Sequence, residues 1–224
     1  MSDFLLTIPR RLHPTIHTFC TDMWDGYLGA IADFLTAHPA VKANVVIDRF
    51  HVARSYRDDF DKMRMQELRR LRRELPEATY QEVSHGMHWV LRHNYANLDD
   101  DDKVRLRRLF HYAPCLHQAY TLREELTAIF NMDLSLTQGR QRLEKWADKV
   151  ERAALACFDK FLKTLHNHLA EIANYFDRRA SSGFVEGLNN KLKTITRRSY
   201  GLQRVDSLFR RLWLDLNGYR HFIA

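Results

Sequence analysis

The sequence predicts a mainly α-helical protein that contains a small parallel β element. The chain has only 8 glycines and 5 prolines among 224 residues, which favours long elements. Short β-compatible runs occur near the N-terminus, and from Phe50 onward no further run of this kind is found. With 45% hydrophobic and 28% charged residues, the chain can bury a core and is not broadly disordered.

The β element is predicted from two short runs with a helix between them. Ile16–Cys20 is β-compatible, and Ala43–Ile47 is the clearest strand, because it is apolar and β-branched like the buried strands of parallel sheets. Trp24–Ala37 has the apolar spacing of an amphipathic helix. The segment is therefore predicted to be strand, helix, strand, with an aspartate at the end of each strand.

The rest of the chain is predicted to be almost wholly helical. Residues 3–8 have the pattern of a helix fragment, and Ser181-Ser-Gly183 is a hinge before the last two helices. From Phe50 onward the chain has no β-like run. Helices are expected at residues 50–74, 77–93, 100–111, 113–130, 135–177, 183–196 and 203–217, and the longest of these can contain a break.

The charge balance favours a polyanionic partner. There are 35 basic and 28 acidic residues, a net charge of +7. The excess clusters at Arg69–Arg73 and between Arg178 and Arg211. Local basic clusters of this kind are typical of nucleic-acid-binding proteins.

Cysteine usage and hydropathy indicate a cytoplasmic protein. Cys20, Cys115 and Cys157 are scattered, and no pair has metal-ligand spacing, so they are expected to be small buried hydrophobic residues in a reducing compartment. No apolar run approaches the roughly 20 residues of a membrane span. The N-terminal residues lack the basic leader and cleavage site of a signal peptide. No membrane association is therefore expected.

Asp22 and Asp48 are the first candidates for a functional site. Ligands of open α/β sheets bind at the carboxyl ends of the strands, where both residues are predicted to lie. If the strands are parallel neighbours, the two carboxylates share one edge of the sheet. The alternative is that each aspartate caps the helix that follows it, since Asp is a favoured N-cap.

Glu186 and the residues after it are the second candidates. Spacings of three and four place Glu186, Asn189, Asn190, Lys193 and Arg197 on one helix face, and Lys191 and Arg198 extend the basic run. An acid that can hold a divalent metal beside phosphate-binding side chains suits an enzyme that cuts or joins nucleic acid. The alternative is a solvated polar face.

Glycine, aromatic and histidine residues near these acids also bear on the predicted function. Gly183 and Gly187 cost about 1 kcal/mol each in a helix relative to alanine, which close approach of a backbone or substrate would explain. Trp24 and Tyr27 can stack on a base or pack in the core. His51, three residues after Asp48, can orient an acid or a phosphate, or be a structural hydrogen-bonding residue.

Four segments, in order along the chain, resemble the ISL-three family of insertion-sequence transposases, which use Asp-Asp-Glu (DDE) catalysis. Each motif is modest alone, but the ordered set is specific and spans nearly the whole chain. The segments are Thr21-Asp-Met-Trp-Asp-Gly-Tyr27, Val45-Val-Ile-Asp-Arg-Phe-His-Val52, Pro114-Cys-Leu-His-Gln-Ala-Tyr-Thr-Leu-Arg-Glu124, and Gly183-Phe-Val-Glu-Gly-Leu-Asn-Asn-Lys-Leu-Lys193 with Arg197-Arg-Ser-Tyr-Gly201.

The resemblance implies a ribonuclease H-like catalytic core split by a helical insertion. It implies cleavage of DNA at the element's ends and strand transfer, with two divalent metals, usually Mg²⁺. Asp22 matches the second catalytic aspartate, on the fourth strand of that core, and Glu186 matches the catalytic glutamate, so both are expected metal ligands. Asp48 and His51 match an accompanying Asp-x-x-His signature. The expected DNA-binding residues are Asn189, Asn190, Lys191, Lys193, Arg197 and Arg198.

The resemblance also implies that part of the enzyme is absent. The family's first catalytic aspartate and its zinc-binding, helix-turn-helix head would precede Met1. We therefore expect a C-terminal portion of a transposase, N-terminally truncated and inactive alone, with a core remnant at 1–52, a helical insertion at 53–178 and core helices at 179–224. A homodimer, or association with a full-length transposase, is expected. The alternative is a non-catalytic basic helical DNA-binding or regulatory module derived from this family.

Overall fold

The chain is divided by its internal contacts into two compact units. The computed structural model describes residues 1–199, 204–218 and 220. The units are Met1–Ala180 and Ser181–Ala224, and the division falls at the predicted serine–glycine hinge. Tyr200 and Gly201, the end of the last family-like motif, lie outside the described residues.

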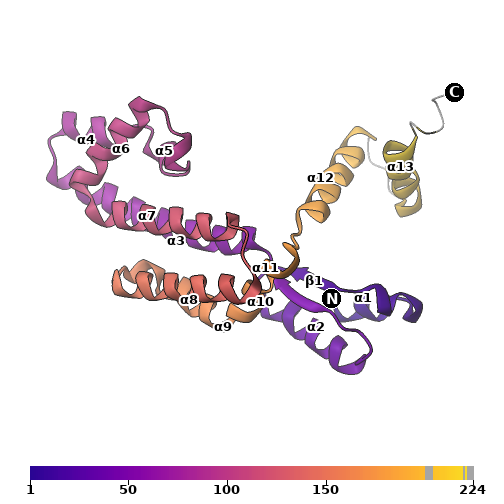
Figure 1. Cartoon of the computed structure of the whole chain (residues 1–224). Helices are drawn as coiled ribbons and strands as arrows, with labels where there is room; N and C mark the ends of the chain where they lie inside the picture. Colours follow the sequence, from indigo (N-terminus) through magenta and orange to yellow (C-terminus); the bar gives the residue numbers. More distant parts are fainter. Residues whose placement is uncertain (200–203, 219, 221–224) are drawn as a thin grey trace. The chain divides into compact units, whose positions relative to one another are not determined.

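The first unit contains the predicted strand–helix–strand segment. Strands β1 (Thr18–Thr21) and β2 (Asn44–Ile47) pair in parallel, with Thr18 opposite Asn44 and Thr21 opposite Ile47. Helix α2 (Asp25–Ala37) connects them (Figure 1). A parallel pair needs such a crossover, because a tight turn cannot return the chain to the same end of the sheet. The predicted parallel element is therefore confirmed.

The N-terminal boundary of β1 differs from the prediction. Residues 3–8 were expected to be helical, and α1 covers Ser2–Leu6; the next segment, Arg10–Thr15, forms a 3₁₀ helix (η1) that was not predicted. The strand therefore begins at Thr18, two residues later than expected. Thr18 pairs with Asn44, the first residue of β2, so the start of β2 sets the start of β1. The residues around Thr18 alone do not reveal where this pairing begins.

Strand β2 joins two hydrophobic clusters. Val45 packs against a small cluster formed by α1, α2 and their connections, whose buried members are Leu5, Ala30, Ile31, Phe34 and Val41. Val46 and Ile47 belong to the large core of the helical part. The Asn174 side-chain amide donates a hydrogen bond to the Val45 carbonyl oxygen over 2.8 Å, so the helical part also covers the outer edge of β2.

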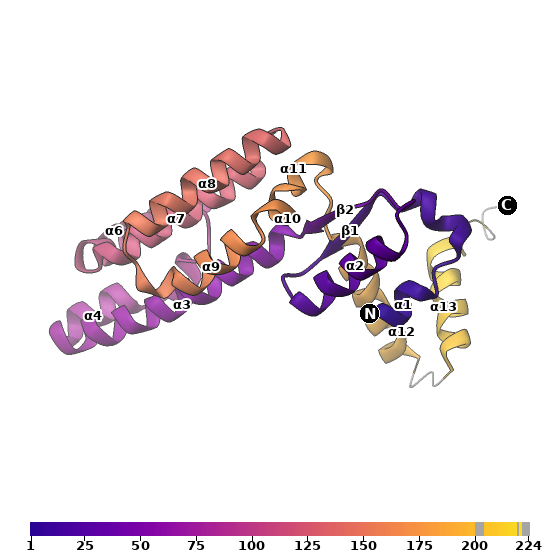
Figure 2. The ribbon, with the colours of Figure 1, turned by 90° about the horizontal axis from the view of Figure 1, so that it is seen from below.

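The large core lies between helices that run side by side in both views (Figures 1 and 2). Rings at its centre pack closely: Tyr56 stacks on Phe158 with centroids 4.3 Å apart, and Trp146 meets Tyr56 and Phe161 edge-on. The Tyr56 hydroxyl and the Trp146 indole N–H each donate to a backbone carbonyl over 2.9 Å, so burial leaves neither polar group unsatisfied. The helices are α3 (Arg49–Glu74), α7 (Pro114–Asn131), α8 (Leu136–Arg152) and α9 (Asp159–Asn167).

Two predicted long helices are interrupted. The helix expected at 77–93 is divided into α4 (Glu77–Ser84) and α5 (Met87–Val90), because Gly86 takes φ +73°. The helix expected at 135–177 breaks after α8, where Ala154 takes φ +51°, and continues in shorter pieces. The remaining elements of this unit are η2 (Tyr95–Asn97), α6 (Asp100–Tyr112), η3 (Ala156–Phe158), α10 (Leu169–Ala173) and α11 (Tyr175–Arg178).

The second unit is a pair of helices, α12 (Gly183–Arg198) and α13 (Val205–Asn217). Ile195 and Leu212 are buried, one on each helix. Apolar side chains on both helices are exposed, including Phe184 at 81% and Phe209 at 57%. Most large apolar side chains of α13 are therefore exposed, among them Val205, Phe209 and Leu214.

The cysteines are free and half-buried, not fully buried as expected. Burial is the main cause that raises the pKa of Cys20, Cys115 and Cys157 to about 11 each. They are therefore protonated at neutral pH and behave as small hydrophobic side chains. Among the described residues, no helix combines the length and the apolar character needed to cross a membrane.

Two helical glycines give a matched test of the core. A Cβ at Gly139 in α8 would lie 2.1 Å from the Phe176 ring, whereas a Cβ at Gly29 in α2 would meet no atom within 4 Å. We expect Gly139→Ala to destabilise the protein by about 1–3 kcal/mol through overpacking, and Gly29→Ala to stabilise it by about 1 kcal/mol. Urea unfolding followed by circular dichroism measures both, and equal effects would contradict the packing of α8 against α11.

Candidate functional site

Asp22 and Asp48 follow paired positions at the same edge of the sheet. Thr21 and Ile47 are opposite one another, and each is succeeded by one of the two aspartates. The Asp48 backbone N–H donates to the Thr21 carbonyl oxygen over 3.0 Å, so the ladder extends to this edge. The prediction that both acids share the carboxyl edge of a parallel pair is confirmed.

The two aspartates differ in what their side chains do. Asp48 is 2% exposed and caps α3, because its Oδ1 accepts a hydrogen bond from the Phe50 backbone N–H over 2.9 Å. Asp22 is half-buried and is not the N-cap of α2, a position that Trp24 occupies. Its Oδ1 accepts from the Trp24 N–H over 3.1 Å, within the turn before α2. The capping interpretation therefore holds for Asp48, whereas Asp22 presents a partly exposed carboxylate.

Three ring side chains follow the two aspartates in the chain: Trp24, Tyr27 and His51. His51 lies half-buried in the first turn of α3, and its backbone N–H donates to the Asp48 carbonyl oxygen. Trp24 is 60% exposed, so its predicted alternative of core packing is wrong; the ring meets Tyr27 edge-on at 4.6 Å. A Cβ at Gly26 would lie 2.7 Å from the Trp24 ring, so the glycine permits this close approach of the indole to the α2 backbone.

Glu186 lies in the first turn of α12, in the second unit. Its side chain is exposed, and its Oε1 accepts a hydrogen bond from the Ser182 hydroxyl over 3.1 Å. A carboxylate in the first turn is favoured by the helix dipole. Gly187 follows it, and a Cβ there would meet no described atom within 4 Å, so packing within the second unit does not explain this glycine.

The predicted DNA-binding residues of α12 fall into two groups. Lys191 forms an ion pair with Asp215 of α13 over 2.7 Å, and this hydrogen bond lowers the pKa of the Asp215 carboxyl below its ordinary value. Arg198 lines a cavity of about 260 Å³ with the same pair and Arg211. The other predicted residues are exposed on α12: Asn189, Asn190, Lys193 and Arg197.

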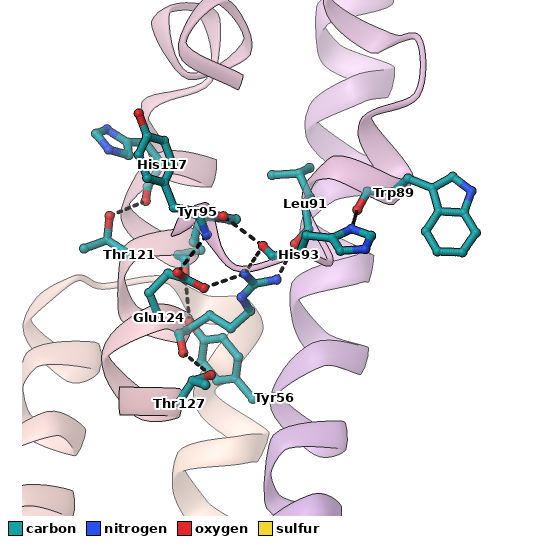
Figure 3. A network of polar contacts seen from close by, with 12 residues as sticks. Tyr56, Trp89, Leu91, His93, Tyr95, His117, Thr121, Glu124 and Thr127 are labelled. Atoms are coloured by element: carbon teal, nitrogen blue, oxygen red, sulfur yellow. Dashed lines mark hydrogen bonds and ion pairs between the residues drawn. The ribbon is translucent and has the colours of Figure 1, made fainter. Parts of the chain in front are cut away.

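A buried arginine in α7 was not found by the sequence analysis. Arg123 is 6% exposed, and its guanidinium donates to the backbone oxygens of Leu91 and His93 and to the Glu124 carboxylate. Figure 3 labels these three partners. Its Nε is a buried polar atom without a hydrogen-bond partner among the described residues, a situation that costs about 1–3 kcal/mol. The detectable signal was its place on the apolar stripe of α7, which also contains Leu116, Ala119, Leu126 and Phe130.

The described residues contain few candidate metal ligands that lie together. No group of three or more His, Cys, Asp or Glu side chains in this part of the chain could hold a metal ion. Asp22 and Glu186 belong to separate compact units. Their predicted meeting around a shared metal therefore stays a prediction.

Comparisons with known proteins identify the family. A family of DDE transposases, the ISL-three family, described as "Transposase", matches residues 1–212. The transposase for insertion sequence element IS1001 of Bordetella parapertussis is 30% identical over 169 residues, which are 75% of this chain and 41% of the relative. The transposase for IS1557 of Mycobacterium tuberculosis is 26% identical over 135 residues, 60% of this chain and 30% of the relative.

The chain spans less than half of the length of these curated relatives. No solved structure matches it. The family match nevertheless extends into both units, from α1 to residue 212 within α13, and includes Asp22, Asp48 and Glu186. The chain belongs to the ISL-three family of DDE transposases.

Proposed function

We propose that this chain supplies part of the catalytic core of a DDE transposase that cleaves DNA at the ends of an insertion sequence and joins those ends to target DNA. The observation that carries the proposal is the position of Asp22, a partly exposed carboxylate at the carboxyl end of a parallel strand pair, within a transposase family match. This is the part of an α/β sheet where ligands bind. In this proposal, β1 and β2 are the fourth and fifth strands of a ribonuclease H-like core.

Asp22 and Glu186 are the proposed metal ligands and catalytic residues. Carboxylate oxygens are the ligands that Mg²⁺ prefers. The Asp22 side chain is half-buried and the Glu186 side chain is exposed. Bound Mg²⁺ would lower the pKa of an attacking water and stabilise the leaving oxygen. Asp48 has a supporting role, because its carboxylate caps α3 and fixes the turn beside Asp22. A third carboxylate from outside this chain would complete the site, so we expect negligible strand transfer by the 224 residues alone.

The proposed meeting of Asp22 and Glu186 can be tested with Mn²⁺, a paramagnetic substitute for Mg²⁺. In ¹⁵N-labelled chain, we expect bound Mn²⁺ to broaden the amide signals of residues around both Asp22 and Glu186. Asp22→Asn should remove the broadening at both places, whereas the exposed Asp33 on α2 provides a matched control in Asp33→Asn. Broadening that is confined to one of the two segments, or that survives Asp22→Asn, would contradict a shared site.

The exposed basic residues of α12 are proposed to bind the DNA backbone. We expect the double substitution of Lys193 and Arg197 by Gln to weaken duplex binding and to reduce the slope of log K against log salt by about 0.9 for each phosphate that is no longer neutralised. Fluorescence anisotropy at several salt concentrations measures this slope. Lys160 and Lys163, exposed at the same kind of spacing on α9, form the charge-matched control pair. An equal loss in both double variants would show that only net charge matters.

A further inference from the structure

A cavity in the helical part of the first unit is lined by three arginines. Its volume is about 210 Å³, and the lining includes Arg57 of α3, Arg92 and Arg123, together with Asn94 and Thr127. The volume is below the roughly 300–1,000 Å³ of pockets that take drug-sized ligands, but several times the roughly 30 Å³ of a water molecule. The size and the lining therefore suit a small anion.

The charges around this cavity do not cancel. Arg92 pairs with Asp61 over 2.9 Å, and Arg123 pairs with Glu124 over 2.7 Å. Asp61 is shared, because it also accepts from Arg64 over 3.1 Å. Arg57 lies over the Phe50 ring at 5.7 Å, and no carboxylate is within ion-pair distance of it among the described residues. Three cations thus line the cavity while the neighbouring carboxylates offset only two of them.

Besides the excess positive charge, the environment of Arg123 also favours an anion at this cavity. Its guanidinium is held by the carbonyls of Leu91 and His93 and by Glu124, whose positions Figure 3 shows, so its orientation is fixed. The Nε–H of the same group is buried and unpartnered among the described residues. A buried donor without a partner is rare in folded proteins, and the residue that carries it lines the cavity. Arginine also matches the geometry of phosphate oxygens better than lysine does.

We propose that the cavity lined by Arg57, Arg92 and Arg123 is a phosphate-binding site, separate from Asp22 and from α12. The ligand chemistry is a tetrahedral oxyanion, supplied either by a DNA backbone phosphate or by free phosphate. Asn94 and Thr127 line the same cavity and add polar groups to its wall. Residues of both α3 and α7 line the site, and Arg123 of α7 lies in the segment that resembles the family's helical middle. The proposal does not depend on the roles proposed for Asp22 or Glu186.

The test measures inorganic phosphate binding by the whole chain. In ¹⁵N spectra of the arginine side chains, phosphate at constant ionic strength should move the Arg123 Nε–H signal saturably. The double variant Arg57→Gln with Arg92→Gln should bind at least about tenfold more weakly, because two charge-assisted hydrogen bonds are lost. Arg123 itself stays unchanged, since its removal would also disturb the fold.

The control variant removes the same charge elsewhere on α3. Arg69 and Arg73 are exposed, and Arg69 is 12 residues beyond Arg57, about 18 Å along the helix and outside the roughly 10 Å Debye length at 0.1 M salt. Arg69→Gln with Arg73→Gln should retain phosphate affinity. Equal losses in the two double variants, or no saturable shift of the Arg123 signal, would overturn the proposal.

A second arm distinguishes the source of the phosphate. If a short DNA duplex moves the same Arg123 signal and inorganic phosphate competes with it, the ligand is a backbone phosphate. If only inorganic phosphate moves the signal, the site binds free phosphate. Neither result depends on Lys193 and Arg197, so failure here and failure of the proposed α12 interface remain distinguishable.

Discussion

Replacing Glu186 by Gln in a full-length transposase that contains this sequence is expected to slow DNA strand cleavage by about 10³-fold, if Glu186 has the role proposed above. The estimate assumes that the proposed metal ligand contributes roughly 4 kcal/mol in the transition state, at about 1.36 kcal/mol for each factor of ten. Glutamine keeps the size of the side chain and an oxygen that can accept from the Ser182 hydroxyl. The fold of α12 should therefore be unchanged, and the loss should be confined to chemistry.

Single-turnover cleavage of a labelled element end in Mg²⁺ measures this effect. DNA affinity, measured in parallel by anisotropy, should be no weaker than that of the unsubstituted protein, because the substitution removes a negative charge. Asp206→Asn, at an exposed position on α13, is the matched control and should cleave normally. Cleavage by Glu186→Gln within about tenfold of the unsubstituted rate would exclude Glu186 as a metal ligand.

Replacing Arg123 by Leu is expected to destabilise the first unit by about 3 kcal/mol, the lower end of the range for breaking a buried ion pair. The Leu91 carbonyl would lose its side-chain donor, the His93 carbonyl would keep only the Tyr120 hydroxyl, and Glu124 would lose its ion-pair partner. The lower end applies because the Glu124 side chain is 28% exposed and water can solvate it. The Tyr120 ring would also lose the guanidinium that lies 4.5 Å from its centroid.

Urea unfolding of the chain checks this value. Arg140→Leu is the matched control, since Arg140 pairs with Glu144 over 3.0 Å but is 53% exposed. Such surface pairs contribute less than about 1 kcal/mol. Similar unfolding midpoints for the two variants would mean that the Arg123 network does not hold the loop after α5 to α7.

The candidate site was predictable where it depends on local pattern. The strand Asn44–Ile47 and the crossover helix Asp25–Ala37 were both predicted from residue type and spacing. The positions of Asp22 and Asp48 at the strand ends then followed from the order of residues in the chain. The single helix at Gly183–Arg198 was predicted within two residues. Spacing could not show that Lys191 is paired with Asp215, because that acid is contributed by a different helix.

The sequence by itself determined the helical class, the parallel strand pair, the acids at its edge and the family, because each depends on residue order and short periodicities. Tertiary structure decided which of two similar aspartates is buried as a cap, that Trp24 faces solvent, and where the chain turns at Gly86 and Ala154. It also decided that Arg57, Arg92 and Arg123 meet at one cavity. These outcomes depend on contacts between residues far apart in the chain, where burial and pairing energies outweigh local propensity.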